Sequence, residues 1–280
     1  MIVQPIEQSL DAKSLQPMIE PLQPKAQADS PVVQLEGVGK RYNEGTVALQ
    51  DVNVVVQEGE FVSLLGPSGC GKSTVLKTIA GLQSASSGSV KVLGDAPERL
   101  SGRPGELSFV FQDATLMPWR TVIGNVALPL ELMRVGKAER LARAAEVLEL
   151  VGLRDVGGKL PRQLSGGMRM RVSIARALIS QPKLLLLDEP FGALDEITRQ
   201  KLNEELLRLW KTLSMTVVFV THNVFEAVYL SSRIVVMKTR PGTVKGEVQV
   251  GMPYPRSGEM RTSPEFGRAL AKAMRFLEEV

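Results

Sequence analysis

One short stretch constrains the fold of this chain more than any other. Residues 66–73 read GPSGCGKS and match the pattern GxxxxGK followed by Ser or Thr, in which backbone N–H groups cradle phosphates. The pattern has this meaning only between a strand and a helix. The apolar run over residues 61–65 and the helical pattern over residues 73–82 supply that context. The sequence therefore predicts an α/β fold built around a phosphate-binding loop.

The residues of this loop are expected to bind a nucleotide through its phosphates. Lys72 should reach the β- and γ-phosphates, and the Ser73 hydroxyl should bind Mg²⁺. Glycine allows the backbone to approach the phosphates, because a Cβ would block that approach. Phosphate crowding also predicts that alkylation of Cys70 inhibits hydrolysis and that bound nucleotide protects the thiol. The expected nucleotide-binding residues are Gly66, Pro67, Ser68, Gly69, Cys70, Gly71, Lys72, Ser73 and Thr74.

A second anion site is indicated at the start of another helix. Ser165, Gly166 and Gly167 begin a helix that runs to about residue 179, and a helix N-terminus attracts anions. This site has no lysine of its own. Arg169 and Arg171 in the first turns oppose the helix dipole, and we expect an anion in front of the helix to offset them. One complete and one partial phosphate site indicate a nucleotide held between two copies of the chain.

Two acidic residues follow a strand that is expected to be buried. Residues 184–187 are four leucines, and Asp188 and Glu189 come directly after them. Next to a phosphate-binding loop, Asp188 is expected to hold Mg²⁺ through water. Glu189 is expected to polarise the attacking water as general base. The alternative is a pair of solvated acids at a strand end.

The rest of the chain is organised around this core. Residues 1–30 contain four prolines among polar residues and are expected to form a flexible leader. The pattern becomes helical from about residue 114 to residue 151. The residues expected on one face there are Leu141, Ala144, Ala145, Leu148 and Val151. Further strands are expected at residues 52–56, 89–93, 108–111, 217–220 and 234–237, the last two as central parallel strands.

Composition sets further limits. With 280 residues, 44% of them hydrophobic, the chain is expected to form one globular domain or a domain with a subdomain. Its formal net charge of +4 is spread along the sequence, which indicates a solvated surface rather than a nucleic-acid site. Cys70 is the only cysteine, so no intramolecular disulfide is expected, which fits a reducing compartment. We identify no signal peptide, and no apolar run approaches the roughly 20 residues of a membrane helix.

Taken together and in this order, the motifs resemble the ATP-binding subunit of an ABC transporter, from about residue 32 to the C-terminus. The resemblance implies an α/β P-loop NTPase core with an antiparallel β-subdomain and an inserted helical subdomain. It divides the chain into a leader at residues 1–30, an ABC ATPase domain at residues 31–250 and a C-terminal extension at residues 251–280. The helical subdomain is expected at about residues 114–165. The implied cofactors are ATP and Mg²⁺.

The resemblance also assigns roles to single residues. Tyr42 is expected to stack on adenine, with a core tyrosine as the alternative. Gln112 is expected to be a ligand of Mg²⁺ and to sense the γ-phosphate, with an ordinary loop glutamine as the alternative. His222 is expected to contact the γ-phosphate and to help fix the attacking water. Residues 165–167 are expected to cover the γ-phosphate held by the partner copy, and residues 193–195 to cross the dimer seam.

Three positions depart from the family pattern. Met168 and Met170 stand where glutamines are common, and Asn223 stands where an aspartate is often found. The groups expected to contact phosphate are backbone N–H groups and the Ser165 hydroxyl, none of which these departures remove. We therefore expect activity to survive them.

Four stretches are similar to one branch of the family, the importers of nitrate, sulfonate, taurine and bicarbonate. They read QDATLMPWRTVIGNV at residues 112–126, PFGALDEITR at residues 190–199, RPG at residues 240–242 and SPEF at residues 263–266. The apolar segment at residues 116–120 is the expected contact for a coupling helix of the membrane subunit. The alternative is that Met117 and Trp119 pack against the helical insertion.

The sequence thus predicts the ATP-hydrolysing subunit of an ABC importer for a small anion. The expected partners are a separate membrane permease, a second copy of the ATPase and, indirectly, a substrate-binding protein, with no nucleic acid. The expected location is the cytoplasmic face of the membrane, as a peripheral subunit. The alternative is a soluble ABC ATPase that acts on nucleic acid or a protein assembly. A regulatory subunit without hydrolysis is opposed by the intact set of Lys72, Asp188, Glu189 and His222.

Overall fold

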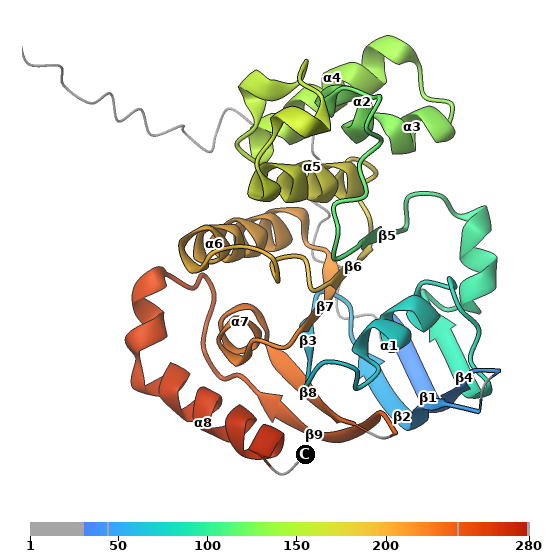
Figure 1. Ribbon diagram of the computed structural model, residues 1–280, viewed down its shortest axis with the longest axis vertical. Coiled ribbons are helices and arrows are strands. Elements are labelled where there is room, and N and C mark those ends of the chain that lie inside the picture. Colours follow the sequence, from blue (N-terminus) through green and yellow to red (C-terminus); the bar gives the residue numbers. More distant parts are fainter. Residues whose placement is uncertain (1–30, 44, 240, 279–280) are drawn as a thin grey trace, which may run out of the picture.

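The computed structural model describes residues 31–43, 45–239 and 241–278, and the expected leader at residues 1–30 lies outside them. The described chain forms two sheets surrounded by helices, with a further layer of helices at one end (Figure 1). The larger sheet has six strands in the order β5-β6-β7-β3-β8-β9. These strands are β3 (Phe61–Leu65), β5 (Leu107–Val110), β6 (Leu184–Asp188), β7 (Thr216–Thr221), β8 (Arg233–Lys238) and β9 (Thr243–Gln249).

The four inner strands of the larger sheet, β6, β7, β3 and β8, are buried on both faces, as their apolar runs predict. Its strands from β5 to β8 are parallel, and β9 pairs with β8 in the antiparallel direction. In β3, Phe61 and Leu65 belong to one hydrophobic cluster, whereas Val62 and Leu64 belong to a second cluster. Because side chains alternate along a strand, each face of the sheet packs against its own core.

The smaller sheet is antiparallel, with strand order β2-β1-β4. Its strands are β1 (Val33–Arg41), β2 (Val47–Val56) and β4 (Ser87–Val92). Val52, Val54 and Val56 of β2 are buried and the residues between them are exposed, as their alternation predicts. Helix α1 (Lys72–Ile79) packs between this sheet and the larger one. The α/β core with an antiparallel β-subdomain is therefore confirmed.

Two helices cover the other face of the larger sheet. They are α7 (Val224–Leu230) and α8 (Pro264–Glu278), which contact each other and strands of that sheet. Phe266, Ala269 and Ala273 of α8 join the same hydrophobic cluster as Phe61 of β3. The chain after residue 250 thus packs on the core, and the division of the chain at that residue stays a prediction.

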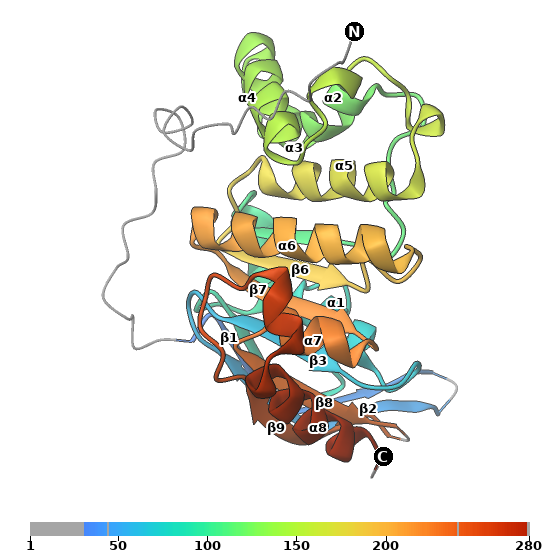
Figure 2. The same cartoon turned by 90° about the vertical axis from the view of Figure 1, so that its left-hand side faces the viewer.

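Helices α2, α3, α4 and α5 form a layer that extends away from the sheets, and α6 lies between this layer and the larger sheet (Figure 2). Within it, α2, α3 and α4 pack against α5, and α5 lies beside α6. The bounds are α2 (Val122–Val126), α3 (Leu128–Leu132), α4 (Lys137–Leu150), α5 (Gly166–Leu178) and α6 (Glu196–Leu213). Short 3₁₀ turns are η2 (Pro97–Gly102), η3 (Arg154–Val156), η4 (Pro161–Gln163) and η5 (Gly258–Thr262). Within the described residues, no helix is both long and apolar enough to cross a membrane.

Three details of the expected helices are wrong. Residues 114–121 contain no helix, and the stretch that follows is divided into three helices, with breaks at Ala127 and at residues 133–136. Pro129 lies in the first turn of α3, where proline is tolerated, and Gly136 precedes α4. Ala145 is exposed, although Ala144 beside it is buried in the predicted face. Helix α1 ends at Ile79 rather than at residue 82, because Gly81 adopts a φ of +69°.

Asn125 of α2 is fully buried and fixes the segment that precedes the helix. Its Oδ1 accepts a hydrogen bond from the backbone N–H of Met117 at 2.7 Å. Its Nδ2 donates to the carbonyl oxygens of Met117, Arg120 and Thr121, each at 3.1 Å. One side-chain amide therefore satisfies backbone groups that this irregular segment cannot pair by itself.

We expect Asn125→Ala to lower the free energy of unfolding by about 3 kcal/mol, because it leaves buried backbone groups without partners. Urea denaturation followed by circular dichroism measures the change. Asn53→Ala is the matched control, because Asn53 makes three hydrogen bonds from an exposed position. Its cost should stay below about 1 kcal/mol. Equal costs at the two positions would contradict the role given to Asn125.

Candidate nucleotide site

Three loops meet at one edge of the larger sheet. The phosphate-binding loop follows β3, Asp188 and Glu189 lie at the end of β6, and His222 follows β7. In the sheet β7 lies between β6 and β3, and all three strands are parallel. Their carboxyl ends therefore bring these residues together, which is where parallel α/β sheets bind ligands.

The backbone of the phosphate-binding loop requires glycine at several positions. Gly69 and Gly71 have φ values of +79° and +93°, a region that other residues rarely adopt. A Cβ on Gly66 would lie 2.6 Å from the carbonyl oxygen of Met237. The loop therefore packs closely against β8 and enters α1 in a conformation that leaves its N–H groups at the helix start.

Lys72 lies inside this loop and is 3% exposed. Its Nζ donates to the carbonyl oxygens of Gly66 and Pro67 at 2.8 and 2.9 Å. The same Nζ lies 3.5 Å from Oε1 of Glu189. The ammonium group is thus held at the centre of the loop, where its charge can attract phosphate.

Ser73 and Asp188 form a pair of oxygen donors at the start of α1. The Ser73 hydroxyl donates to Oδ1 of Asp188 at 2.8 Å. Burial raises the pKa of Asp188, and the hydrogen bond from Ser73 opposes that rise. Oxygen donors suit a hard cation such as Mg²⁺, which keeps several water or phosphate ligands. Among the described residues, no group of three or more His, Cys, Asp or Glu could hold a metal.

Gln112 is exposed just after β5, and no hydrogen bond joins it to Ser73 or Asp188 within the described part of the chain. The strand β5 is nevertheless next to β6 in the sheet, so Gln112 and Asp188 leave neighbouring strand ends. Its role as a ligand of Mg²⁺ stays a prediction.

Glu189 and His222 are in direct contact. Nδ1 of His222 lies 2.8 Å from Oε2 of Glu189, whose side chain is 15% exposed. Glu189 adopts a φ of +44°, and its backbone N–H donates to Val220 of β7 at 3.0 Å. A strained backbone at a non-glycine residue is common in functional sites. The carboxylate is therefore placed where it can accept a proton from water, beside an imidazole that can orient that water.

Tyr42 lies just beyond β1 and is 43% exposed. Its hydroxyl donates to Oε1 of Gln83 at 3.2 Å, and Nζ of Lys40 lies 5.6 Å from the centre of its ring. The alternative of a core tyrosine is therefore wrong. An exposed ring can stack on a base, and the assignment to adenine stays a prediction.

Helix α5, whose start is the predicted second anion site, lies away from α1 and the phosphate-binding loop of the same chain (Figure 1). The Ser165 hydroxyl caps α5 by accepting from the backbone N–H of Met168 at 3.3 Å. A Cβ placed on Gly167 would lie 3.1 Å from Thr198, and one on Gly166 would lie 3.9 Å from Leu194. In one chain, these residues therefore pack against the segment that starts α6.

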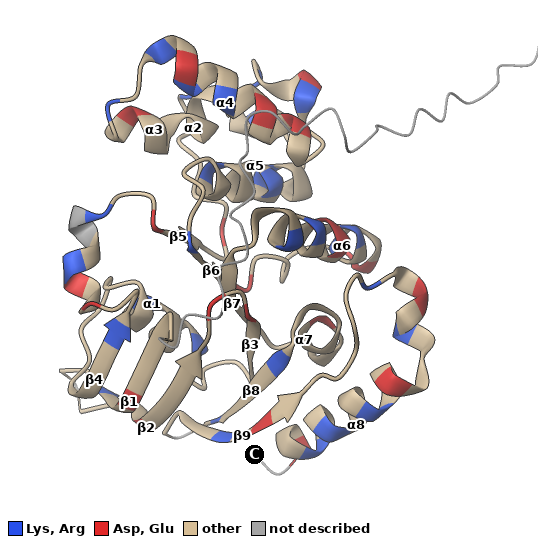
Figure 3. Ribbon diagram, turned by 180° about the vertical axis from the view of Figure 1, so that it is seen from behind, with Lys and Arg blue, Asp and Glu red and all other residues tan. Residues whose placement is uncertain are grey.

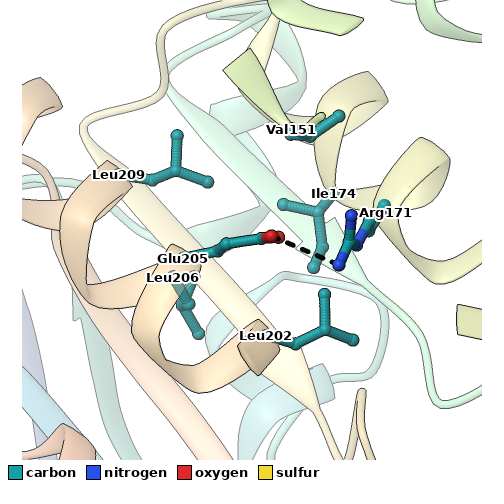
Figure 4. A pocket seen from close by; sticks show the side chains of 7 residues that line it. All are labelled: Val151, Arg171, Ile174, Leu202, Glu205, Leu206 and Leu209. Carbon is teal, nitrogen blue, oxygen red and sulfur yellow. Dashed lines mark ion pairs between the residues drawn. The ribbon is translucent and has the colours of Figure 1, made fainter. Parts of the chain in front are cut away.

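The two arginines of α5 have partners within the chain, and the expected anion in front of the helix stays a prediction. Arg169 donates to the carbonyl oxygen of Leu164 at 2.8 Å. Arg171 forms an ion pair with Glu205 of α6 at 3.2 Å, among apolar side chains of both helices (Figure 4). Burial raises the pKa of Glu205, and Arg171 opposes that rise. This pair joins the helical layer to the core.

Cys70 does not face the phosphate side of the loop. Its side chain is 1% exposed and belongs to the hydrophobic cluster beneath α1. Burial also raises the pKa of the Cys70 thiol, and alkylation needs an accessible thiolate. The thiol is therefore poorly accessible in the folded protein, and the predicted inhibition by alkylation and its protection by nucleotide stay predictions.

Two residues were missed as parts of the site. Asn223 caps α7 by accepting from the backbone N–H groups of Phe225 and Glu226, as an aspartate would. Gly242, at the start of β9, accepts from Gln50 N–H and donates to the carbonyl oxygen of Ala48. A Cβ on Gly242 would overlap the carbonyl oxygen of Cys70 in the phosphate-binding loop. Gly242 belongs to the RPG stretch, which marked a family resemblance in the sequence and not a contact of the phosphate-binding loop.

Comparisons with known proteins agree with this geometry. A family model described as ABC transporter matches residues 49–192. The chain is 47% identical over 232 residues to an uncharacterised ABC transporter ATP-binding protein of Methanocaldococcus jannaschii, which covers 83% of this chain and 85% of that protein. It is 41% identical over 249 residues to the aliphatic sulfonates import ATP-binding protein SsuB of Bacillus cereus, covering 88% and 96% of the two chains.

Two further relatives extend the comparison. The nitrate import ATP-binding protein NrtD of Synechocystis sp. is 42% identical over 235 residues, covering 82% of this chain and 86% of that protein. Among solved structures, a dimeric post-hydrolysis state of an ATP-binding cassette bound to ADP and Pi superimposes with a TM-score of 0.71. It is 38% identical and covers 79% of this chain and 100% of that one.

We expect Gly242→Ala to weaken ATP binding by about tenfold, which is about 1.4 kcal/mol, because the added methyl displaces the backbone of the phosphate-binding loop. Titration with a fluorescent ATP analogue measures the dissociation constant. Gly251→Ala is the control, because a Cβ at that position meets nothing within 4 Å. Unchanged affinity in folded Gly242→Ala protein would show that this contact does not shape the loop.

Proposed function

The chain belongs to the ABC transporter family as an ATP-binding subunit, and we propose that it hydrolyses ATP to drive import of a small anion through a separate membrane permease. The observation that carries the proposal is the contact of Glu189 with both Lys72 and His222, at 3.5 and 2.8 Å. The import direction is supported by relatives named as sulfonate and nitrate import proteins.

Each polar group of the site has a distinct task in hydrolysis. Backbone N–H groups at the start of α1 and the ammonium of Lys72 bind the phosphates. Glu189 accepts the proton of the attacking water, and His222 holds that carboxylate and the water in line. Ser73 and Asp188, with Gln112, would hold Mg²⁺, which neutralises charge on the phosphates when bound.

One chain holds two phosphate sites that do not face each other, so we propose a head-to-tail dimer. In such a dimer, Ser165, Gly166 and Gly167 of one copy cover the ATP held by the loop of the other copy. The dimeric cassette bound to ADP and Pi supports a dimer. The proposed interface is isologous, because each copy offers the same two sites to the other, and ATP favours the closed state if it binds that state more tightly.

The surface for the permease is proposed on the helical layer. Trp119 is 74% exposed and Leu132 is 76% exposed. Asn125 fixes the segment that carries Trp119, whereas Met117 is partly buried. The alternative that Met117 and Trp119 pack against the helical insertion is therefore wrong for Trp119, whereas partly buried Met117 is hydrogen-bonded to Asn125 of α2 through its backbone. An exposed apolar side chain on a fixed segment suits a docking surface for a membrane subunit.

The surroundings of the subunit follow from this proposal. It is peripheral to the cytoplasmic face of the membrane, and a substrate-binding protein acts on the permease from the other side. The alternative of a soluble ATPase acting on nucleic acid is not favoured, because Lys and Arg are scattered among Asp and Glu over many elements (Figure 3). The proposed cargo is nitrate, an alkanesulfonate, taurine or bicarbonate.

We expect Glu189→Gln to form a stable dimer when ATP is present, because the amide cannot accept the proton while phosphate binding is retained. Size-exclusion chromatography with light scattering measures the mass with and without ATP. The control combines Glu189→Gln with Lys72→Ala, which should weaken ATP binding and leave a monomer. A Glu189→Gln protein that stays monomeric with ATP bound would exclude the closed dimer.

Uptake of labelled taurine, alkanesulfonate, nitrate and bicarbonate tests the cargo. Cells that carry the wild-type gene or Glu189→Gln are compared, and one of the four uptake activities should be lost in the variant. Trp119→Ala should reduce that same uptake while the ATPase activity of the isolated subunit is kept. No change in any of the four would remove these anions as cargo.

A further inference from the structure

Arg199 lies in the first turn of α6 and joins three separate groups. Its Nη2 donates to the carbonyl oxygen of Leu194 at 2.8 Å, within the stretch expected to cross the dimer seam. Its Nη1 donates to Oε2 of Glu196 at 3.1 Å. Its Nε lies 3.7 Å from Oε1 of Glu226 on α7. Only 19% of the Arg199 side chain is exposed, so Arg199 is largely buried between these groups.

Glu226 is the buried partner in this contact, with 7% of its side chain exposed. Its Oε2 accepts a hydrogen bond from the Thr221 hydroxyl at 2.6 Å. Its Oε1 and the Nε of Arg199 are both buried and have no hydrogen-bond partner. They face each other beyond hydrogen-bond distance, although a shift of about 1 Å would create a charge-assisted hydrogen bond.

Thr221 connects Glu226 to the catalytic histidine. Its hydroxyl donates to Glu226 and also accepts from the backbone N–H of Asn223 at 2.9 Å. Thr221 and Asn223 flank His222, so this hydroxyl closes the turn that carries the imidazole. A continuous chain of polar contacts therefore runs from Leu194 through Arg199, Glu226 and Thr221 to the turn of His222.

We propose that Arg199 and Glu226 are positioning residues. They fix residues 193–195 and the turn that carries His222 relative to each other, so that His222 keeps its contact with Glu189. The inference rests on the proposed ATP hydrolysis. Neither side chain touches Glu189, Lys72 or the phosphate-binding loop among the interactions of the described residues. The effect of Arg199 on catalysis therefore passes through the turn, whereas the Glu226 carboxylate also interacts with His222 through its charge.

The geometry of the pair argues against a purely stabilising role. A buried ion pair repays its desolvation only when its geometry is good, and often stabilises no more than apolar residues of the same volume. Here one hydrogen bond of the pair is not formed. A contact of this kind is a poor source of stability, but it is sensitive to small movements of either loop.

Steady-state ATPase kinetics test the proposal with Arg199→Gln, Glu226→Gln and the double variant. Each single change should lower kcat by about tenfold and change the KM for ATP by less than about twofold, because the phosphate-binding residues are untouched. The double variant should be no slower than the slower single variant, because both changes break the same chain of contacts.

His222 is the only histidine of the chain, so its imidazole gives a single set of proton NMR signals. Both single variants should shift these signals, since each frees the same turn, and Glu226→Gln also removes a charge that interacts with His222. Arg199→Gln is the more informative variant, because Arg199 has no direct contact with His222 among the described residues. Unshifted signals in folded Arg199→Gln protein would overturn the proposal.

Glu60→Gln is the matched control. Glu60 pairs with Arg233, an arginine with 9% of its side chain exposed, at 3.0 Å, away from the catalytic edge. This change should lower thermal stability and leave kcat and the His222 signals unchanged. If Glu226→Gln behaves like Glu60→Gln, the positioning role is excluded. If the wild-type protein itself hydrolyses no ATP, the proposed function fails instead.

Discussion

The carboxylate of Glu189, which follows β6, is held by two groups that follow the next two strands of the sheet, β7 and β3. Lys72 approaches it from the loop after β3, and His222 approaches it from the turn after β7. This geometry depends on the sheet order, in which β7 lies between β6 and β3. Because the three strands are parallel, their loops leave the same edge. The two hydrophobic cores therefore support the site, because the packed sheet holds Lys72 and His222 within reach of the Glu189 carboxylate.

Close backbone packing makes that edge rigid before any nucleotide binds. Gly66 lies against the carbonyl oxygen of Met237 at the end of β8, and Gly242 lies against that of Cys70. The Cys70 side chain points into the core below. The phosphate-binding loop is thus packed against Met237 and Gly242 on one side and continues into α1 on the other. Donors that are already in place stabilise developing charge without reorganisation, which is the main source of electrostatic catalysis.

Sequence alone was sufficient for features that have a local signal. The apolar run at residues 61–65 is β3, and Ser165 caps α5 as its position before two glycines predicts. The contact of Gly242 with the phosphate-binding loop could not be predicted, because it joins segments far apart in the chain. The hydrogen bonds of Asn125 depend on the path of an irregular segment. The helical periodicity of residues 114–151 predicted which side chains are buried. It did not show where one helix ends and the next begins.

The helical layer links the two surfaces that the proposed dimer and the permease would use. Residues 165–167 start α5, and α2 packs directly on α5. Asn125 of α2 holds the segment that exposes Trp119. A movement of residues 165–167 towards the nucleotide of a second copy must therefore carry the Trp119 segment with it, unless the packing of α2 on α5 is broken. The layer meets α6 through the ion pair of Arg171 with Glu205, through apolar side chains of α5 and α6, and through a hydrogen bond from Arg208 to the carbonyl oxygen of Leu150. A movement of the layer would therefore be passed on to α6 as well, because packed units move as bodies.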